Sequence, residues 1–198
     1  MAQSEKASLH YRLTVSIEVD GAILSGSATQ AIEVVGVGSF SPTEATLLSD
    51  YYGDAIEIPL EGGGVVFATM ANPGSGSYGP GLLRACGILD PYEGGTKATA
   101  AVREFEGSCE ADAGKVALLV YMSDPRDPNT MRNARQMKNI DIARVTLTTI
   151  DTAVTNDLSR TYTWLSSASA RFSVQSDPHP ITIFANVFSK KPPGEAAI

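Results

Sequence analysis

Histidine and cysteine are scarce in this 198-residue chain, which contains two of each. A structural zinc site needs four Cys or His ligands at grouped spacings, and nothing groups Cys86, Cys109, His10 and His179 in this way. The sequence therefore argues against structural zinc. His10 falls among the polar positions of an alternating segment and His179 lies between two prolines, so both are expected to be solvated rather than catalytic.

Positive charge is also in short supply. The chain has 15 Lys and Arg against 22 Asp and Glu, a formal net charge of −7 at pH 7. Binding to nucleic acid needs several clustered cations, whereas the one basic doublet, Lys190-Lys191, precedes a proline pair near the C-terminus. We predict no nucleic-acid partner and a solvated tail.

Long apolar runs are missing. No segment reaches the roughly 18 apolar residues of a membrane-spanning helix, and the first fifteen residues contain no apolar core of a signal peptide. We predict no membrane span. On this sequence alone the protein is expected in the cytoplasm, and the periplasm or cell envelope is the alternative if a targeting segment is missing.

Sequence motifs for nucleotide binding and for a hydrolase nucleophile are either absent or lie in segments where the required secondary structure is not expected. The chain has neither the Gly-Lys-Ser/Thr end of a P-loop nor the G-x-S-x-G of a hydrolase elbow. Residues 74–79 read G-x-G-x-x-G, but the preceding strand is expected to belong to a hairpin rather than to a βαβ unit. We expect a surface loop there, and we predict no catalytic residue and no cofactor-binding residue.

The two cysteines leave a choice open. Cys86 and Cys109 could form a disulfide in an oxidising compartment, closing a loop of 23 residues. Two unpaired buried thiols are the preferred interpretation, because the spacing by itself does not indicate pairing.

Alternation of apolar and polar residues dominates the N-terminal part of the chain. Successive residues of a strand face opposite sides, so this pattern predicts a strand with one buried face. The apolar side chains occupy the odd positions: Leu9, Tyr11, Leu13, Val15, Ile17 and Val19. Asp20-Gly21 is suited to a turn, and residues 22–35 are expected to return as a second strand with a bulge at Gly26.

The rest of the chain predicts further strands and two short helices. Strands are expected at residues 54–60, 65–70, 116–122, 141–151, 170–174 and 181–188, and helices at 80–89 and 157–166. The predicted fold is β-rich, all-β or α+β, with an antiparallel or mixed sheet or sandwich and one or two short helices. The predicted organisation is a flexible N-terminus at 1–8, a single domain at 9–189 and a flexible C-terminal tail at 190–198.

One acidic loop offers oxygen ligands to a metal. Residues 123–130 read Ser-Asp-Pro-Arg-Asp-Pro-Asn-Thr, and their candidate ligands are Asp124, Asp127 and Asn129. Calcium binds carboxylate and amide oxygens of this kind, but the EF-hand pattern is missing. Asp-Pro pairs also form turns through hydrogen bonds from the Asp side chain to its own backbone. We expect a turn, with calcium as the alternative and no other cofactor.

Several short motifs resemble, in order, those of an uncharacterised family of proteobacterial proteins. The similar segments are residues 11–15, 20–21, 25–27, 55–68, 116–130, 142–147, 153–155 and 163–165. The resemblance spans residues 11–165 and implies a bacterial protein. It assigns no site, since the family has no established activity or cofactor. Many members have an N-terminal hydrophobic anchor, which this sequence does not show.

Missing catalytic signatures and many turn-rich strands predict a non-enzymatic accessory or ligand-binding bacterial domain with a protein or small-molecule partner. Two alternatives stay open. A carboxylate-based hydrolase or lyase would need two acids converging in an apolar pocket. A structural subunit of a homo-oligomer would expose an apolar patch or an unpaired sheet edge, for which residues 181–188 are the candidate. The residues that line the largest cavity would distinguish these three functional hypotheses.

Overall fold

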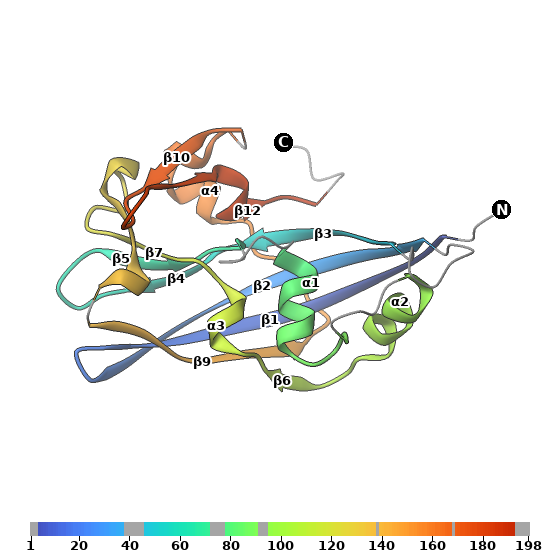
Figure 1. The fold of residues 1–198 in the computed structure, drawn as a ribbon. Helices are drawn as coiled ribbons and strands as arrows, with labels where there is room; N and C mark the ends of the chain where they lie inside the picture. The colour runs from blue at the N-terminus through green and yellow to red at the C-terminus, as the bar shows by residue number, and fades with distance from the viewer. Residues whose placement is uncertain are drawn as a thin grey trace.

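The computed structural model describes residues 4–37, 46–71, 78–90, 95–137, 139–167 and 169–192. Its strands form three antiparallel sheets with short helices packed against them, which confirms the predicted fold class (Figure 1). Within these ranges, no helix is long and apolar enough to cross a membrane. Most of the glycine-rich motif expected as a surface loop falls outside the described residues, which resume at Tyr78.

The predicted opening hairpin is present and longer than expected. β1 (Ser4–Val19) pairs with β2 (Ala22–Val37) without interruption, from Ser4↔Val37 to Val19↔Ala22. Residues 4–8, expected to be a flexible N-terminus, therefore belong to the sheet. The odd-numbered residues from Leu9 to Ile17 are buried as predicted. Positive φ angles at Asp20 (50°) and Gly21 (84°) form the two-residue turn that follows the twist of the strands.

The hairpin forms the centre of a six-stranded sheet in the order β12-β3-β2-β1-β9-β6. Its other strands are β3 (Thr46–Asp54), β6 (Ser108–Glu110), β9 (Ile140–Thr149) and β12 (Ser189–Lys190). Helices cover one face of this sheet in Figure 1: α1 (Tyr78–Ala85), α2 (Gly95–Glu104) and α3 (Ala113–Val116). The sequence pattern predicted α1 but neither β3 nor α2.

A four-stranded sheet, β4-β5-β7-β8, forms the next layer. Its strands are β4 (Ile56–Pro59), β5 (Val65–Ala68), β7 (Leu119–Met122) and β8 (Met131–Asn133). The strand expected at residues 116–122 begins only at Leu119 and lies inside this sheet, whereas β4 is an edge strand that ends at Pro59. The small outer layer contains β10 (Arg171–Val174), β11 (Ile181–Phe184) and α4 (Leu158–Thr161). Four 3₁₀ helices complete the described elements: Pro128–Thr130, Ala134–Gln136, Thr163–Leu165 and Ala185–Val187.

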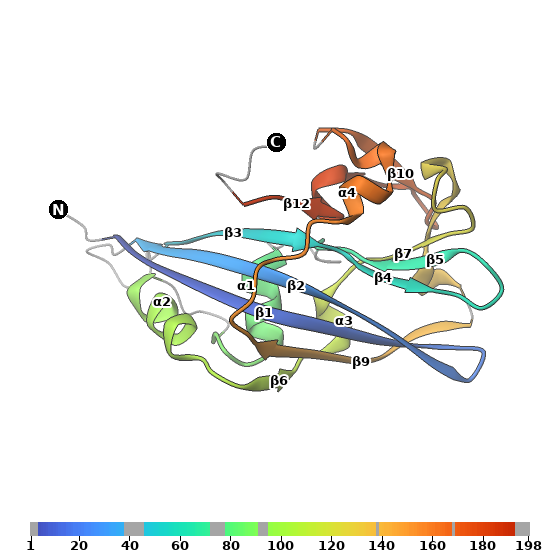
Figure 2. The ribbon, with the colours of Figure 1, turned by 180° about the vertical axis from the view of Figure 1, so that it is seen from behind.

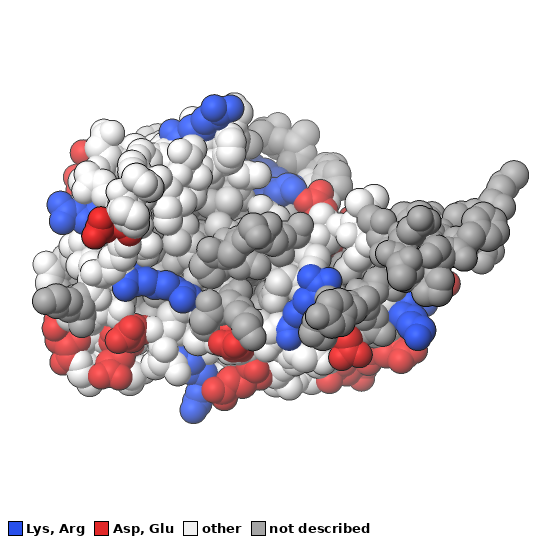
Figure 3. Space-filling view, in the orientation of Figure 1, with Lys and Arg blue, Asp and Glu red and all other residues white. Residues whose placement is uncertain are grey.

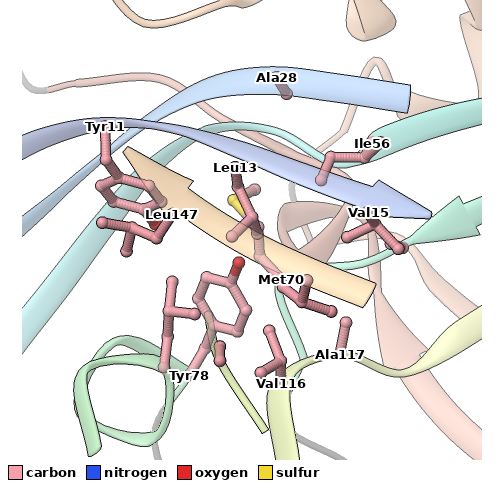
Figure 4. Packing of buried hydrophobic residues seen from close by; sticks show 14 of the residues in the cluster. Tyr11, Leu13, Val15, Ala28, Ile56, Met70, Tyr78, Val116, Ala117 and Leu147 are labelled. Atoms are coloured by element: carbon pink, nitrogen blue, oxygen red, sulfur yellow. The ribbon is translucent and has the colours of Figure 1, made fainter. Parts of the chain in front are cut away.

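Two apolar clusters hold these layers together. The first lies between the long hairpin, α1 and the inner face of the four-stranded sheet, where Leu13 and Val15 meet Met70 and Val116 (Figure 4). The second lies on the outer face of that sheet, around Phe67. Apolar side chains cover both faces of this sheet, so its inner strands β5 and β7 are continuous apolar runs, whereas the edge strand β4 alternates buried and less buried residues.

The bulge predicted at Gly26 is wrong. Pairing between β1 and β2 passes through Gly26 in regular register. The glycine instead allows close packing, because a Cβ there would lie 2.5 Å from the carbonyl oxygen of Glu57 and 2.8 Å from Ile56 Cγ2. The irregularity lies between β1 and β9, where the register shifts after Ser16 and exposes Ala143.

The interpretation of the cysteines as free thiols is also wrong. Cys86 and Cys109 form a disulfide with their Cα atoms 5.6 Å apart. The chain after α1 and the residues after β6 are already joined by the backbone, since the Asp112 N–H donates to the Ala85 carbonyl at 3.1 Å. This long-range contact brings the two sulfurs together, and sequence spacing carries no sign of it.

The segment after β9, residues 150–157, crosses the face of the large sheet opposite the helices (Figure 2). We call it the strap. It binds three strands in turn: the Ile150 N–H donates to the His10 carbonyl at 3.1 Å and the Thr155 N–H to the Thr29 carbonyl at 3.0 Å. At its end the Asp157 N–H donates to Asp54 Oδ2 at 2.5 Å. The strap thus ties β1, β2 and β3 together and leads into α4.

Candidate functional site

The predicted metal-binding loop uses its polar side chains to hold its own backbone. Asp124 Oδ1 accepts from the Arg126 N–H at 2.9 Å. Asp127 Oδ1 accepts from the N–H of Asn129 at 2.9 Å and from its side-chain amide at 2.8 Å. Asp127 thereby caps the 3₁₀ helix that follows it. These hydrogen bonds give the loop the turn chemistry that its Asp-Pro pairs predict. In the described part of the chain, no group of three or more His, Cys, Asp or Glu residues is arranged to hold a metal.

A buried polar cluster links the long hairpin to α1. The hydroxyls of Tyr11 and Tyr78 both donate to Gln30 Oε1, at 2.9 and 3.0 Å, and Gln30 Nε2 donates to the Asp54 carbonyl at 2.7 Å. Burial raises the pKa of both tyrosine hydroxyls above their usual value. These buried hydrogen bonds hold β1, β2 and α1 in place relative to one another.

Asp54 is the one buried carboxylate among the described residues, with 3% of its surface exposed. Its Oδ2 accepts from the Asp157 and Leu158 N–H groups at 2.5 and 3.1 Å, which fixes the end of the strap on β3. Burial raises the pKa of this carboxyl above its usual value. No second acid faces it in an open cavity, so its role is structural as far as the described residues show.

Two surface clefts have the same volume, about 460 Å³ each. The first lies between β1, the end of α2 and the strap. Its lining is largely polar and charged and includes His10, Arg103, Glu106 and Asp151. His10 is exposed, and its Nδ1 lies within hydrogen-bonding distance of the Thr152 carbonyl oxygen, at 3.3 Å. Opposite charges are mixed along this cleft, so it presents no single chemistry.

The second cleft lies between the turn of the β1–β2 hairpin and the turn of the β4–β5 hairpin, and we call it the tip cleft. Both turns lie at the same end of the molecule (Figure 1). Most of its lining is apolar and packs against the main core cluster. The apolar lining residues are Val19, Ala22, Leu24, Leu60, Tyr121, Met137 and Ile140, and the others are Asp20, Glu61, Gly62, Gly63 and Asn139.

Tyr121 is the aromatic residue of this cleft. Its ring packs on Gly64, where φ is +81° and an added Cβ would lie 3.0 Å from Tyr121 Cε2. Only glycine fits both this backbone conformation and this contact. The ring is half-buried, and its hydroxyl has no hydrogen-bond partner within the described ranges. The Tyr121 hydroxyl is therefore a polar group of the cleft that a ligand could reach without breaking an existing hydrogen bond.

The mouth of the cleft is held in place by Asp20. Its backbone N–H donates to the Asn139 carbonyl at 3.3 Å, and its Oδ2 accepts from Asn139 Nδ2 at 3.1 Å. These bonds join the β1–β2 turn to the start of β9. Sequence analysis predicted the turn at residues 20–21, but not that it would face the turn at residues 61–63 across a cleft.

No known protein family, curated protein or solved structure matches this chain. The chemistry of the tip cleft is therefore the strongest basis for a function.

Proposed function

We propose that this protein is a non-enzymatic ligand-binding domain that takes the apolar part of a small molecule into the tip cleft. The observation that carries the proposal is a 460 Å³ cleft with an apolar floor that is open to solvent. Ligand pockets typically enclose about 300–1,000 Å³ and combine apolar walls with a few polar groups. Tyr121, Asn139 and Asp20 supply such polar groups here.

The lining of the clefts supports binding over carboxylate catalysis. Neither of the two 460 Å³ clefts is lined by Asp124 or Asp127. The acids of the tip cleft, Asp20 and Glu61, are exposed at its mouth rather than enclosed in its apolar floor. A general acid and its partner carboxylate need a dehydrated site of defined spacing.

Surface chemistry also supports binding over assembly through β11. Phe184 on this strand is 42% exposed. The guanidinium carbon of Arg171 lies 5.2 Å from the centre of its ring. The charged group stacked on this ring covers part of the exposed apolar surface, which disfavours association through that surface.

We further propose an oxidising compartment, the periplasm or cell envelope of a bacterium, in place of the cytoplasm. The support is the Cys86–Cys109 disulfide, because such bonds persist where thiols are not kept reduced. Titration of free thiols in protein taken from its native cells tests this. No reactive thiol is expected after denaturation, and two per chain would contradict the proposal.

Binding in the tip cleft is tested with 2-phenylethanol, a neutral probe with a small aromatic body. In an NMR titration we expect saturable shifts of the backbone amides of Leu24, Leu60 and Met137. Ala22→Trp fills the cleft and should abolish these shifts, whereas Ala143→Trp adds the same side chain at an exposed position outside it. Absence of saturable shifts, or equal binding by the Ala22→Trp variant, would overturn the proposal.

A further inference from the structure

The mouth of the tip cleft is acidic on both sides. Asp20 belongs to the β1–β2 turn and Glu61 to the β4–β5 turn, and both side chains are exposed. The described lining residues include no Lys, Arg or His, so these two acids give the lining a formal charge of −2. Acidic side chains gather at the lower left of Figure 3, the end of the molecule where both turns lie.

Both carboxylates have oxygens available for a new partner. Asp20 uses only Oδ2 in its hydrogen bond to Asn139. Within the described residues, Glu61 makes neither a hydrogen bond nor an ion pair. A ligand that brings hydrogen-bond donors to the mouth would meet acceptors that need not break existing bonds.

Below the mouth, the half-buried ring of Tyr121 adds an aromatic surface. An aromatic face attracts cations as well as apolar groups. The cleft therefore combines an apolar floor, an aromatic wall and a negatively charged entrance. A molecule with an apolar body and a positively charged end matches all three, while an anion would be repelled at the entrance.

We propose that the tip cleft selects a small organic amine, whose apolar body lies on the floor and whose ammonium group stays between Asp20 and Glu61. This inference rests on the proposed ligand-binding function and adds the charge of the ligand. Exposed charge pairs each contribute modestly, about 0.2–1 kcal/mol. Two such pairs correspond to a preference of about twofold to thirtyfold for the amine over a neutral molecule of the same size.

Three probes with the same phenylethyl group but a different end charge test the effect of ligand charge: 2-phenylethylamine, 2-phenylethanol and 3-phenylpropanoate. At pH 7 and low salt, NMR titration should give the amine a Kd about twofold to thirtyfold lower than that of the alcohol, and the acid the weakest binding. Added salt should reduce the advantage of the amine, because exposed charges are screened.

A double variant and a matched control test the two acids. Asp20→Asn with Glu61→Gln should bring the Kd of the amine to that of the alcohol, with both probes measured on the same variant. Glu18→Gln with Asp141→Asn removes the same total charge from exposed positions outside the cleft lining and should keep the preference.

The outcomes distinguish the two proposals. Equal binding of amine and alcohol to the unaltered protein would overturn the charge selection and leave the ligand-binding function standing. Equal loss of preference in both double variants would also overturn it, because the field of the whole acidic protein would then be the cause. If none of the three probes binds the unaltered protein, the ligand-binding function itself fails.

Discussion

A methyl group on Gly26 tests whether the long hairpin packs directly on the four-stranded sheet. An added Cβ would lie 2.5 Å from the Glu57 carbonyl oxygen, 2.8 Å from Ile56 Cγ2 and 3.0 Å from Ile58 Cγ1. Carbon atoms in cores prefer separations of about 3.5–4.0 Å. Gly26→Ala therefore has to move β2 and β4 apart by roughly 1 Å at this point.

The expected loss follows from where this contact lies. Ile56 and Ile58 are 0% and 1% exposed, so neither can rotate into solvent to make room. Overpacking of a buried site costs about 1–3 kcal/mol, and a contact with backbone belongs at the upper end. Replacing glycine returns up to about 1 kcal/mol through the lower entropy of the unfolded chain. We expect a net loss of about 2 kcal/mol, equivalent to a Tm lower by roughly 4–8 °C for a chain of this length.

Urea denaturation and thermal melting measure this loss. Gly62→Ala is the matched control, because nothing lies within 4 Å of an added Cβ at that turn. The control should be at least as stable as the unaltered protein, with a gain of up to about 1 kcal/mol from the lower entropy of its unfolded chain. A Gly26→Ala variant as stable as this control would refute the close packing of β2 on β4.

Three further measurements test other parts of the structure. Burial raises the pKa of Asp54 above its usual 3.8. The Asp54 carboxyl group therefore stays protonated to a higher pH in the folded state than in the unfolded state. We compare the free energy of unfolding of the unaltered protein with that of Asp54→Asn. The difference should decrease as pH rises from 3.8 through the raised pKa, and a difference independent of pH would contradict this. Replacing Cys86 and Cys109 by alanine, or reducing the disulfide, should lower the free energy of unfolding in urea by about 3 kcal/mol, because the bond closes a 23-residue loop. Equal stability with and without the bond would refute this contribution. Asp127→Ala should lower the free energy of unfolding by about 1 kcal/mol, because the cap of the 3₁₀ helix is lost. Calcium should leave the Tm of the unaltered protein unchanged, and a Tm that rises with calcium would restore the metal-site hypothesis.

Regular alternation and turn residues predicted the parts of the fold that depend on local sequence. From Leu9 to Ile17 the odd residues are buried because β1 has one face on the core throughout. Strict alternation with the buried Val145 and Leu147 would place Ala143 on the buried face, but a register shift between β1 and β9 leaves it exposed. The rule of alternation also failed for β3, whose Asp50 and Gly53 interrupt any alternation and whose pairing with β2 fixes it as a strand. Tertiary pairing outweighs local preference there.

The candidate site could not be predicted because it depends on contacts between distant residues. Asp20 and Glu61 each lie in a turn of predictable type, but the cleft exists only because β2 packs on β4 behind them. Tyr121 reads as one residue of a buried strand, and it reaches the cleft because Gly64 lacks a side chain. Asp124 and Asp127, the acids that the sequence singled out, lie in a turn outside this cleft.

Intermolecular NOEs between 2-phenylethylamine and the protein test the central claim most directly. We predict NOEs from the aromatic protons of the probe to Leu24 on the first hairpin, to Leu60 at the second and to Tyr121 between them, since all three line the tip cleft. NOEs confined to residues outside this cleft, or none at concentrations that saturate the amide shifts, would contradict it.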